Sequence, residues 1–243
     1  MEFSAKTDIG LKRSMNQDSF KCGMLEKENI AWAVVCDGMG GMAAGNIASE
    51  QTTSVVSKAL EQNLSPKASS KFILNLLKTS VDSANATVFD MSSKNEELRG
   101  MGTTVIAVVV KNNTVSLVHA GDSRAYIFKD GELSQITTDH SVVQTMVESG
   151  QITQDEANHH PNKNIITRAV GVAPTIQTDV SEITLCSDDI ILLCTDGLTN
   201  CVDANLLKNT IIDTEFSILA ERLVDLANQN GGNDNITVVA IKL

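Results

Sequence analysis

Four aspartates in this sequence share a setting that suits metal binding. Each adjoins an apolar run and lies at or next to a glycine or an asparagine; they are Asp37, Asp122, Asp196 and Asp234. A buried strand holds its end rigidly, so aspartates at several strand ends can converge on one point. Convergent carboxylates repel one another unless a cation lies between them, and hard cations that prefer oxygen ligands fit such a place. The pattern therefore indicates a site for Mg²⁺ or Mn²⁺.

The competing interpretation is that these aspartates lie in turns, because Asp-Gly between apolar runs is the strongest short hairpin signal. Asp130-Gly131 has alternating strand-like residues on both sides, which predicts a plain turn. Asp37 differs, since a glycine-rich turn and a helical stretch follow it. Asp196 is followed by a polar loop and helix, and Asp234 precedes a strand. These different downstream structures favour one shared site over four separate turns.

A polar loop near the start of the sequence supplies the complement to a cation site. Arg13 carries a guanidinium that can bind an anion through two N–H groups, and Asp18 follows in the same loop. Alone, this loop would be ordinary. Beside the four aspartates it provides an anion pocket next to a cation cluster, which is the equipment of phosphoryl chemistry.

A glycine pattern after Asp37 offers a different function. Gly38, Gly40 and Ala43 fit the outline of a dinucleotide fingerprint between a strand and a helix. A Rossmann unit also needs a second parallel strand ending in an acid about twenty residues on. This sequence has helical stretches there, so a nucleotide-binding oxidoreductase is the less favoured alternative, and titration with NAD would test it.

Three further motifs give little indication of a function. Asp139-His140-Ser141 holds the residue types of a hydrolase triad, but adjacent residues cannot orient one another in the required relay. We interpret His159-His160 as a solvated loop pair. Thr103-Thr104 is interpreted as the start of a strand, without chemistry.

The elements that must position these residues follow from hydrophobic periodicity. Strands are predicted at residues 3–8, 30–36, 103–110, 114–119, 124–128, 132–136, 176–183, 190–194 and 236–243. Helices are predicted at 43–60, from Pro66 past Val88, and at 216–227. Turns at Asn112-Asn113 and Asp130-Gly131 imply antiparallel hairpins. We therefore predict an α+β fold, with two packed antiparallel sheets and helices outside them.

Composition narrows the function classes. The chain has 243 residues, of which 42% are hydrophobic, enough for one sizeable core in one large domain or two small ones. A net charge of -11 argues against nucleic acid and anionic membranes as partners. No apolar run is long enough to span a bilayer and no signal peptide is evident, so a cytoplasmic location is expected. Five cysteines without a C-x-x-C pair make a zinc site improbable, and Cys36 and Cys194 suit a core.

The sequence resembles the metal-dependent serine/threonine protein phosphatases of the PP2C (PPM) family, in the compact bacterial form. The matching segments follow the family's order over essentially the whole chain: RSMNQD (13–18), DGMGG (37–41), GMGTT (100–104), GDSR (121–124), DHS (139–141), ITRAVG (166–171), TDG (195–197) and GNDNIT (232–237). The resemblance implies one domain over residues 1–243, a β-sandwich flanked by pairs of antiparallel helices, and a flap at about 141–170.

The resemblance also implies a set of metal ligands for two Mn²⁺ or Mg²⁺ ions and a third. Asp37 would bridge two metals, with the Gly38 carbonyl on the second. Asp196 and Asp234 would hold the first. Asp18 would act on the second through water, and Asp122, together with Asp196, would hold the third.

Other roles follow from the same resemblance. Arg13 would grip the substrate phosphate, and Asn235 would support the first metal site. In or beside the flap, which is thought to affect substrate choice, the singled-out residues are Asp139, His160 and Arg168.

The implied reaction is hydrolysis of phosphoserine and phosphothreonine in proteins. Two metals share a water, and the resulting hydroxide attacks phosphorus in line without a phosphoenzyme. The partners would be phosphorylated proteins and a serine/threonine kinase that the enzyme opposes, with no nucleic acid or membrane and with a monomeric protein.

One position departs from the family pattern. Bacterial relatives usually carry a histidine after DGMGG, where this sequence has Met42, and Met39 cannot donate a proton either. A general acid contributes roughly 10²–10⁴-fold to rate. Turnover of good leaving groups should suffer less from its loss, and His160 or a metal-bound water would have to compensate. The rival hypothesis is a signalling module of the same fold that binds phosphoprotein and metal but barely turns over.

Overall fold

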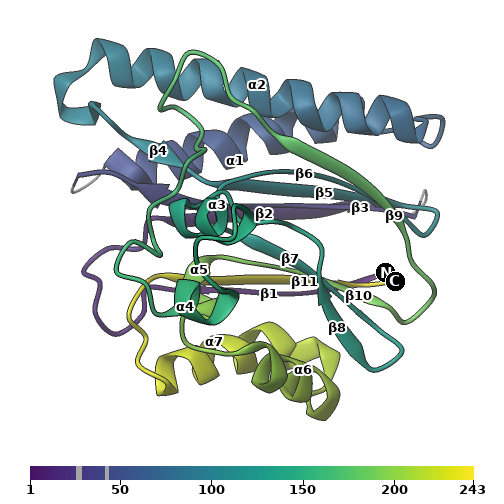
Figure 1. Ribbon diagram of the computed structural model, residues 1–243. Helices are drawn as coiled ribbons and strands as arrows, with labels where there is room; N and C mark the ends of the chain where they lie inside the picture. The colour runs from purple at the N-terminus through teal and green to yellow at the C-terminus, as the bar shows by residue number, and fades with distance from the viewer. Residues whose placement is uncertain (26–28, 42–43) are drawn as a thin grey trace.

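The computed structural model describes residues 1–25, 29–41 and 44–243, which form four layers (Figure 1). Helices α1 (Ala44–Asn63) and α2 (Ser70–Lys94) cover the outer face of one sheet. Helices α6 (Ala204–Asp213) and α7 (Leu219–Gln229) cover the other sheet. The two sheets pack on each other between these helix layers. The predicted α-β-β-α architecture is therefore confirmed.

The strands of both sheets pair in antiparallel fashion. The sheet under α6 and α7 has the order β1 (Glu2–Asp8), β11 (Ile236–Lys242), β10 (Ile190–Cys194), β7 (Arg124–Lys129) and β8 (Glu132–Gln135). The sheet under α1 and α2 has the order β2 (Asp18–Leu25), β3 (Ile30–Met39), β5 (Val105–Lys111), β6 (Thr114–Ala120) and β9 (Asp179–Thr184), with β4 (Gly102–Thr103) paired to the end of β3. Positive φ angles at Asn112, Asn113, Asp130 and Gly131 confirm the two predicted hairpin turns.

Strand β3 shows why its sequence is apolar without a break. Trp32 and Val34 pack under α1 and α2, whereas Ala33 and Val35 face the space between the sheets. Both faces of the strand are buried, so the usual alternation of polar and apolar residues disappears. Cys36 also lies in the helix-facing core, as predicted.

The space between the sheets changes character at one end. In its middle it is filled by side chains such as Val35, Leu193 and Val239. Because side chains alternate along a strand, the next residues pointing into it are Asp37, Thr195 and Thr237. The apolar core therefore ends in a polar layer, and this layer forms the floor of the site described below.

Several predicted boundaries were wrong. Strand β2 was missed, because DSFKCGML has no clear alternation, and it places Asp18 in a strand rather than in a loop. Strand β3 continues to Met39, so Asp37 lies within it. Helix α2 begins after its N-cap Ser69, whose side chain accepts from the Phe72 N–H, and not at Pro66.

Smaller shifts occur elsewhere. Strand β9 begins at Asp179, later than the predicted residue 176. The helix predicted from residue 216 starts as a 3₁₀ turn, Phe216–Ile218, before α7. A short helix, α5 (Asp196–Thr199), begins at Asp196 itself. Ala43, the predicted start of the first helix, lies outside the described residues.

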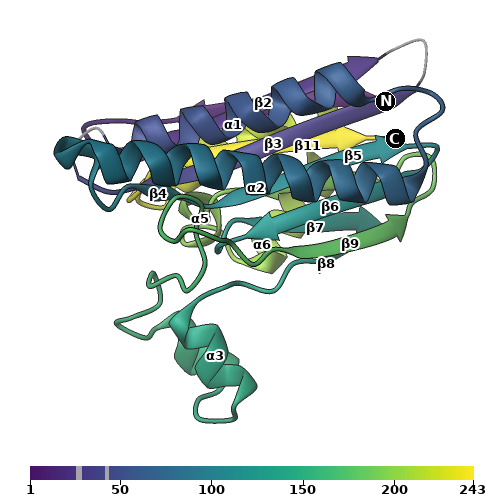
Figure 2. The ribbon, with the colours of Figure 1, turned by 90° about the horizontal axis from the view of Figure 1, so that it is seen from above.

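The segment predicted as a flap carries two short helices, α3 (Val142–Glu148) and α4 (Gln154–Asn158). Figure 2 shows α3 projecting sideways from the layered body. The two ends of the flap segment lie together, because Ser141 and Ile166 form an isolated antiparallel bridge. Among the described residues, no helix combines the length and apolar character needed to cross a membrane.

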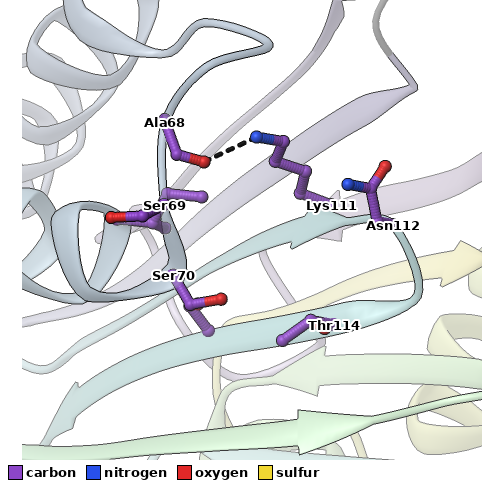
Figure 3. A pocket seen from close by; sticks show the side chains of 8 residues that line it. Ala68, Ser69, Ser70, Lys111, Asn112 and Thr114 are labelled. Carbon is purple, nitrogen blue, oxygen red and sulfur yellow. Dashed lines mark hydrogen bonds between the residues drawn. The ribbon is translucent and has the colours of Figure 1, made fainter.

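At the end of the β2–β3–β5 sheet opposite Asp37, a lysine holds the connection between α1 and α2. Lys111 at the end of β5 donates from Nζ to the carbonyl of Pro66 at 2.6 Å. It also donates to the carbonyl of Ala68 at 2.5 Å (Figure 3). The ammonium thereby ties the α1–α2 connection to the sheet. A cavity of about 230 Å³ lies beside it, far from the acidic residues.

Candidate metal centre

Two of the acidic residues lie side by side on adjacent strands. Asp18 of β2 and Asp37 of β3 are register partners, so their side chains emerge on the same face of the sheet. That face looks into the polar end of the space between the sheets. The opposite sheet supplies hydroxyls there: Thr195 and Thr237 both donate to Asp18 Oδ2, at 2.8 and 2.7 Å.

The other three aspartates reach the same end from separate connections. Asp122 lies between β6 and β7, Asp196 opens α5 directly after β10, and Asp234 precedes β11. The pKa values of these carboxyl groups are shifted by one another's charges, which indicates that the groups lie close together. Burial, followed by the charges of Asp18, Asp196, Asp122 and Asp234, raises the pKa of Asp37 well above its ordinary value. The structure thus brings together the residues that the sequence singled out.

The same crowding perturbs the neighbours of Asp37. Burial raises the pKa of Asp18 to about 7, and the charges of Asp196 and Asp234 add to this. Burial, with the charge of Asp196, raises the pKa of Asp122 to about 8. The pKa of Asp196 is also raised, by burial and then by Asp234. Ionising these groups together is therefore costly unless positive charge is placed among them.

Two buried carboxylate oxygens in this cluster have no hydrogen-bond partner among the residues that the structure describes. Asp18 Oδ1 and Asp196 Oδ1 are buried, and neither accepts a hydrogen bond from the described residues. A buried carboxylate oxygen without a donor is unfavourable, and a divalent cation is the natural complement to a set made only of oxygen ligands. The residues present therefore fit Mg²⁺ or Mn²⁺.

The peptide groups of Asp37 are fixed by two threonines to which sequence reasoning assigned no chemistry. Thr104 Oγ1 accepts from the Asp37 N–H at 2.8 Å, and Thr104 N donates to the Asp37 carbonyl at 2.9 Å. Thr103 Oγ1 donates to the same carbonyl at 2.8 Å. The signal available in the sequence was the GMGTT segment, one of those that carried the family resemblance.

Gly38, the predicted carbonyl ligand, lies where no side chain fits. A Cβ at this position would collide with the Gly45 carbonyl in α1 and lie 2.6 Å from the Gln17 carbonyl. The Gly38 N–H donates to Gln17 O at 3.1 Å. The loop before β2 and the start of α1 therefore close on the backbone beside Asp37.

Arg13 lies at the rim of the carboxylate cluster. Its Nη2 donates to Asp234 Oδ2 at 2.7 Å, and the side chain is 53% exposed. The bond to Asp234 and the nearby charges of Asp37 and Asp196 raise the pKa of the guanidinium. This places a permanent positive charge next to the carboxylates with open solvent on its other side.

Asn235 holds the loop that carries Arg13. Its side chain accepts from Gln17 N at 2.8 Å and donates to the carbonyls of Ile9 and Met15, both at 2.9 Å. The side-chain amide of Asn235 thus connects three backbone groups of this loop. Because Asn235 directly follows Asp234, the loop and the adjacent carboxylate share one anchor.

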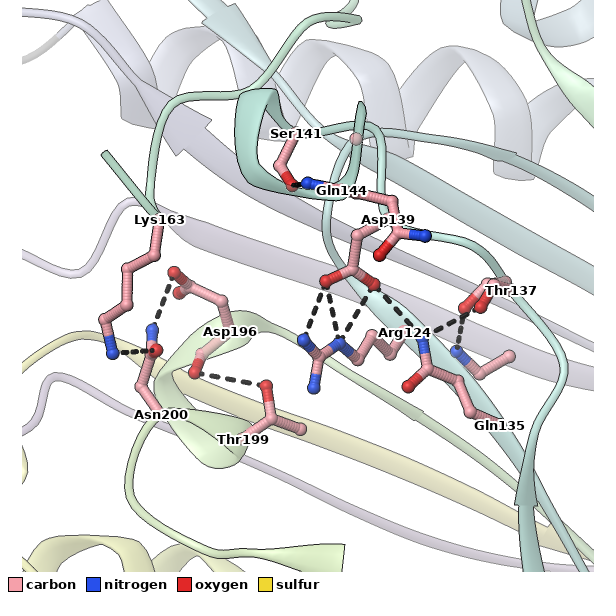
Figure 4. Close-up of polar contacts among 12 residues, drawn as sticks. Arg124, Gln135, Thr137, Asp139, Ser141, Gln144, Lys163, Asp196, Thr199 and Asn200 are labelled. Atoms are coloured by element: carbon pink, nitrogen blue, oxygen red, sulfur yellow. Dashed lines mark hydrogen bonds and ion pairs between the residues drawn. The ribbon is translucent and has the colours of Figure 1, made fainter. Parts of the chain in front are cut away.

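A cleft of about 880 Å³ begins at Asp122 and Asp196 and extends between the flap and α6. Figure 4 shows an ion pair on one of its walls, where the Arg124 guanidinium bonds both carboxylate oxygens of Asp139. The figure also shows a chain of contacts from the flap: Lys163 Nζ donates to Asn200 Oδ1 at 3.0 Å, and Asn200 Nδ2 donates to Asp196 Oδ2 at 2.9 Å. The flap is therefore linked to Asp196 through the side chain of Asn200.

The hydrogen bonds of the remaining predicted residues, His160 and Arg168, involve none of the five aspartates among the described residues. His160 Nδ1 accepts from the backbone N–H of Asn162 within the flap. Arg168, at the end of the flap, donates to Asp179 Oδ1 at 2.8 Å. Met42 lies outside the described residues, so the expectation about a missing general acid stays a prediction.

Comparisons with known proteins agree with this geometry. The sequence profile of the family named protein phosphatase 2C matches residues 12–236. The chain is 34% identical over 244 residues to the serine/threonine phosphatase stp of Listeria monocytogenes, covering 100% of this chain and 96% of that protein. The structure of the S. agalactiae serine/threonine phosphatase superposes with a TM-score of 0.92 at 34% identity, covering 100% of this chain and 99% of that one.

A second solved structure bears on the metal. The catalytic domain of the serine/threonine protein phosphatase PstP, in complex with two manganese ions, matches with a TM-score of 0.86 at 34% identity, covering 98% of this chain and 96% of that one. The family profile spans nearly the whole chain, and these similarities extend over its full length. This protein belongs to the protein phosphatase 2C family.

Proposed function

We propose that this protein is a metal-dependent phosphatase that hydrolyses phosphoserine and phosphothreonine in proteins. The observation that carries the proposal is the cluster of five aspartates on separate segments, with buried carboxylate oxygens that lack donors. Family membership supports it, since relatives of similar length are serine/threonine phosphatases.

The aspartates would hold two Mn²⁺ or Mg²⁺ ions, and the catalytic domain of PstP is known in complex with two manganese ions. The residues that would hold these ions are Asp37, Asp196, Asp234 and Asp18, together with the Gly38 carbonyl. Asp122 with Asp196 would hold a third ion. Bound ions would supply activation of a water for attack on phosphorus and neutralisation of charge on the phosphoryl oxygens.

The residues of the chain would divide the remaining work. Arg13 has one face on Asp234 and the other open to solvent, so it can grip two phosphoryl oxygens of an entering substrate. Asn235 keeps the Arg13 loop closed, and Thr103 and Thr104 keep the Asp37 backbone fixed. Fixed groups of this kind stabilise developing charge without reorganising during the reaction.

The substrate polypeptide would occupy the cleft beside Asp122 and Asp196. Residues 1–243 would act as one domain, with the flap at 141–170 shaping the cleft. The partners would be phosphorylated proteins, including those of a serine/threonine kinase whose action the enzyme reverses, and the working state would be a monomer.

Hydrolysis of a phosphothreonine peptide and of an aryl phosphate, in EDTA and then with added Mn²⁺ or Mg²⁺, tests the proposal. We expect turnover of both substrates that requires the metal and is lost in Asp37→Asn, because the bridging carboxylate charge is gone. Aryl turnover alone would support the prediction that Met42 leaves the enzyme without a general acid. Metal binding without turnover of either substrate would refute the catalytic proposal in favour of a binding module.

A further inference from the structure

Two buried histidines hold the peptide groups of Gly121, the residue before Asp122. The Gly121 N–H donates to His140 Nδ1 at 3.1 Å, and the Gly121 carbonyl accepts from the backbone N–H of His140 at 2.8 Å. His119 bonds to the same carbonyl through Nε2 at 3.1 Å. The two imidazoles stack with their centroids 4.2 Å apart. Gly121 is thus held on both sides by one residue and from a third direction by another.

These contacts fix the tautomers of both rings. The Gly121 N–H donates to His140 Nδ1, which is therefore the bare nitrogen, so the proton of a neutral ring lies on Nε2. Nε2 is 3.1 Å from Asp179 Oδ2 and 2.9 Å from Arg168 Nη1. His119 donates from Nε2 to a carbonyl, so its Nδ1 is the bare nitrogen. Burial lowers the pKa of both rings, that of His119 to about 4, in agreement with neutral imidazoles.

Ligand atoms of His119, His140 and Asp179 lie within 4.8 Å of one another, which could suggest a second metal site. The contacts argue against that interpretation. His140 uses both ring nitrogens and His119 uses Nε2 in the bonds described above. Arg168 Nη1 lies 2.8 Å from Asp179 Oδ1 and 2.9 Å from His140 Nε2, so a guanidinium already supplies the positive charge.

The histidine cluster joins both ends of the flap to the loop that bears Asp122. His140 precedes the first flap residue, and its carbonyl accepts from Thr167 N at 2.8 Å. Arg168 follows Thr167 and bonds to Asp179. Gly121 has a φ of +114°, and a Cβ there would lie 2.6 Å from the Thr104 side chain, so this turn accommodates only glycine. The direction of Asp122 therefore depends on how the Gly121 peptide is held.

We propose that His140 is a positioning residue that holds the Gly121 peptide and so orients the Asp122 carboxylate toward a metal ion. Asp179 and Arg168 hold the His140 ring in the required rotamer and couple it to the flap. The inference rests on the proposed function for the role of Asp122, but the contact between His140 and Gly121 can be tested without it.

The two nitrogens of the ring can be separated by substitution. In His140→Asn, the short amide can place its oxygen near the position of Nδ1 and accept from the Gly121 N–H. In His140→Gln, the longer amide reaches toward the position of Nε2 and Asp179 instead. His159→Asn is the matched control, because that ring is exposed and bonds to the Asp155 carbonyl of its own flap helix.

Two readouts are independent of catalysis. The first is deuterium uptake of the backbone around Gly121 in EDTA, measured by mass spectrometry. The second is calorimetric titration with Mn²⁺. We expect His140→Gln to speed exchange around Gly121 and to weaken the weakest Mn²⁺ site roughly tenfold or more, as loss of an orienting partner does. His140→Asn should restore most of both, and His159→Asn should change neither.

A double-mutant comparison distinguishes loss of the Asp122 orientation from a general loss of rigidity in the protein. If His140 acts through Asp122, His140→Gln should have no further effect on Mn²⁺ affinity in an Asp122→Ala background. Equal behaviour of the Asn and Gln variants, unchanged exchange around Gly121, or additive losses with Asp122→Ala would each overturn the proposal. A wild-type protein that hydrolyses no phosphopeptide but shows the expected exchange and Mn²⁺ effects would refute the phosphatase and leave this inference standing.

Discussion

Asp18→Asn should stabilise the metal-free protein while removing part of its response to metal. Asp18 is 7% exposed as a residue, and its Oδ2 accepts from Thr195 and Thr237. Its Oδ1 has no donor within the described part of the chain. An asparagine can keep both threonine bonds through its own oxygen and place an NH₂ at the orphaned position. The substitution therefore removes charge from the cluster at little cost in packing.

The magnitude follows from the pKa of Asp18, which burial raises from 3.8 to about 7. The folded state binds this proton more tightly than the unfolded state, so the stability linked to it is present below pH 3.8. That stability is lost as the pH rises from 3.8 through about 7. Each pKa unit corresponds to about 1.4 kcal/mol, so the loss is about 4 kcal/mol. Bound Mn²⁺ should suppress the loss, because it favours the ionised carboxylate.

Urea denaturation in EDTA at pH 4 and at pH 8 measures this effect. We expect the wild type and Asp18→Asn to be of similar stability at pH 4, and the variant to be more stable by up to about 4 kcal/mol at pH 8. Asp225→Asn, an exposed charge on α7, is the control for net charge. The reasoning is refuted if Asp18→Asn is less stable than the wild type at pH 8 in EDTA, or if Mn²⁺ stabilises both proteins equally.

Three further predictions concern the groups around the cluster. Asn235→Ala removes three hydrogen bonds of the Arg13 loop and should lower the free energy of unfolding by about 3 kcal/mol; an unchanged urea midpoint would contradict it. Arg13→Lys keeps the charge but loses the paired N–H geometry, so kcat/KM for a phosphothreonine peptide should fall roughly tenfold, and equal kinetics would remove Arg13 from phosphate binding. Asp139→Asn leaves the mostly buried Arg124 guanidinium without its carboxylate partner. The free energy of unfolding, measured by thermal denaturation, should therefore fall by about 3 kcal/mol. An unaltered Tm would mean that the pair contributes no more than an exposed surface ion pair.

The sequence was sufficient to predict the layers of the fold and the acidic cluster, for a physical reason. Strands buried on both faces, such as β3 and β10, appear as unbroken apolar runs, and hairpin turns such as Asp130-Gly131 have strong local signatures. Asp37 and Asp196 stand out because charge at the edge of such runs is costly without a purpose.

What the sequence did not reveal depends on contacts between distant segments. Strand β2 is partly exposed and has no clear period, so its pairing with β3 was not predicted, and neither was the register that sets Asp18 opposite Asp37. Thr103 and Thr104 look like a strand start until the structure shows them bonding to the Asp37 peptide. His140 looked like part of a false triad because its partners, Gly121 and Asp179, lie far from it in sequence.

Anomalous diffraction from crystals soaked in Mn²⁺ tests the central claim most directly, since it locates the metal without relying on activity. The account predicts two strong manganese peaks within about 2.0–2.3 Å of oxygens of Asp37, Asp196 and Asp234. A weaker third peak is expected beside Asp122. Manganese bound at His119, His140 and Asp179 instead, with none at the aspartates, would contradict the account.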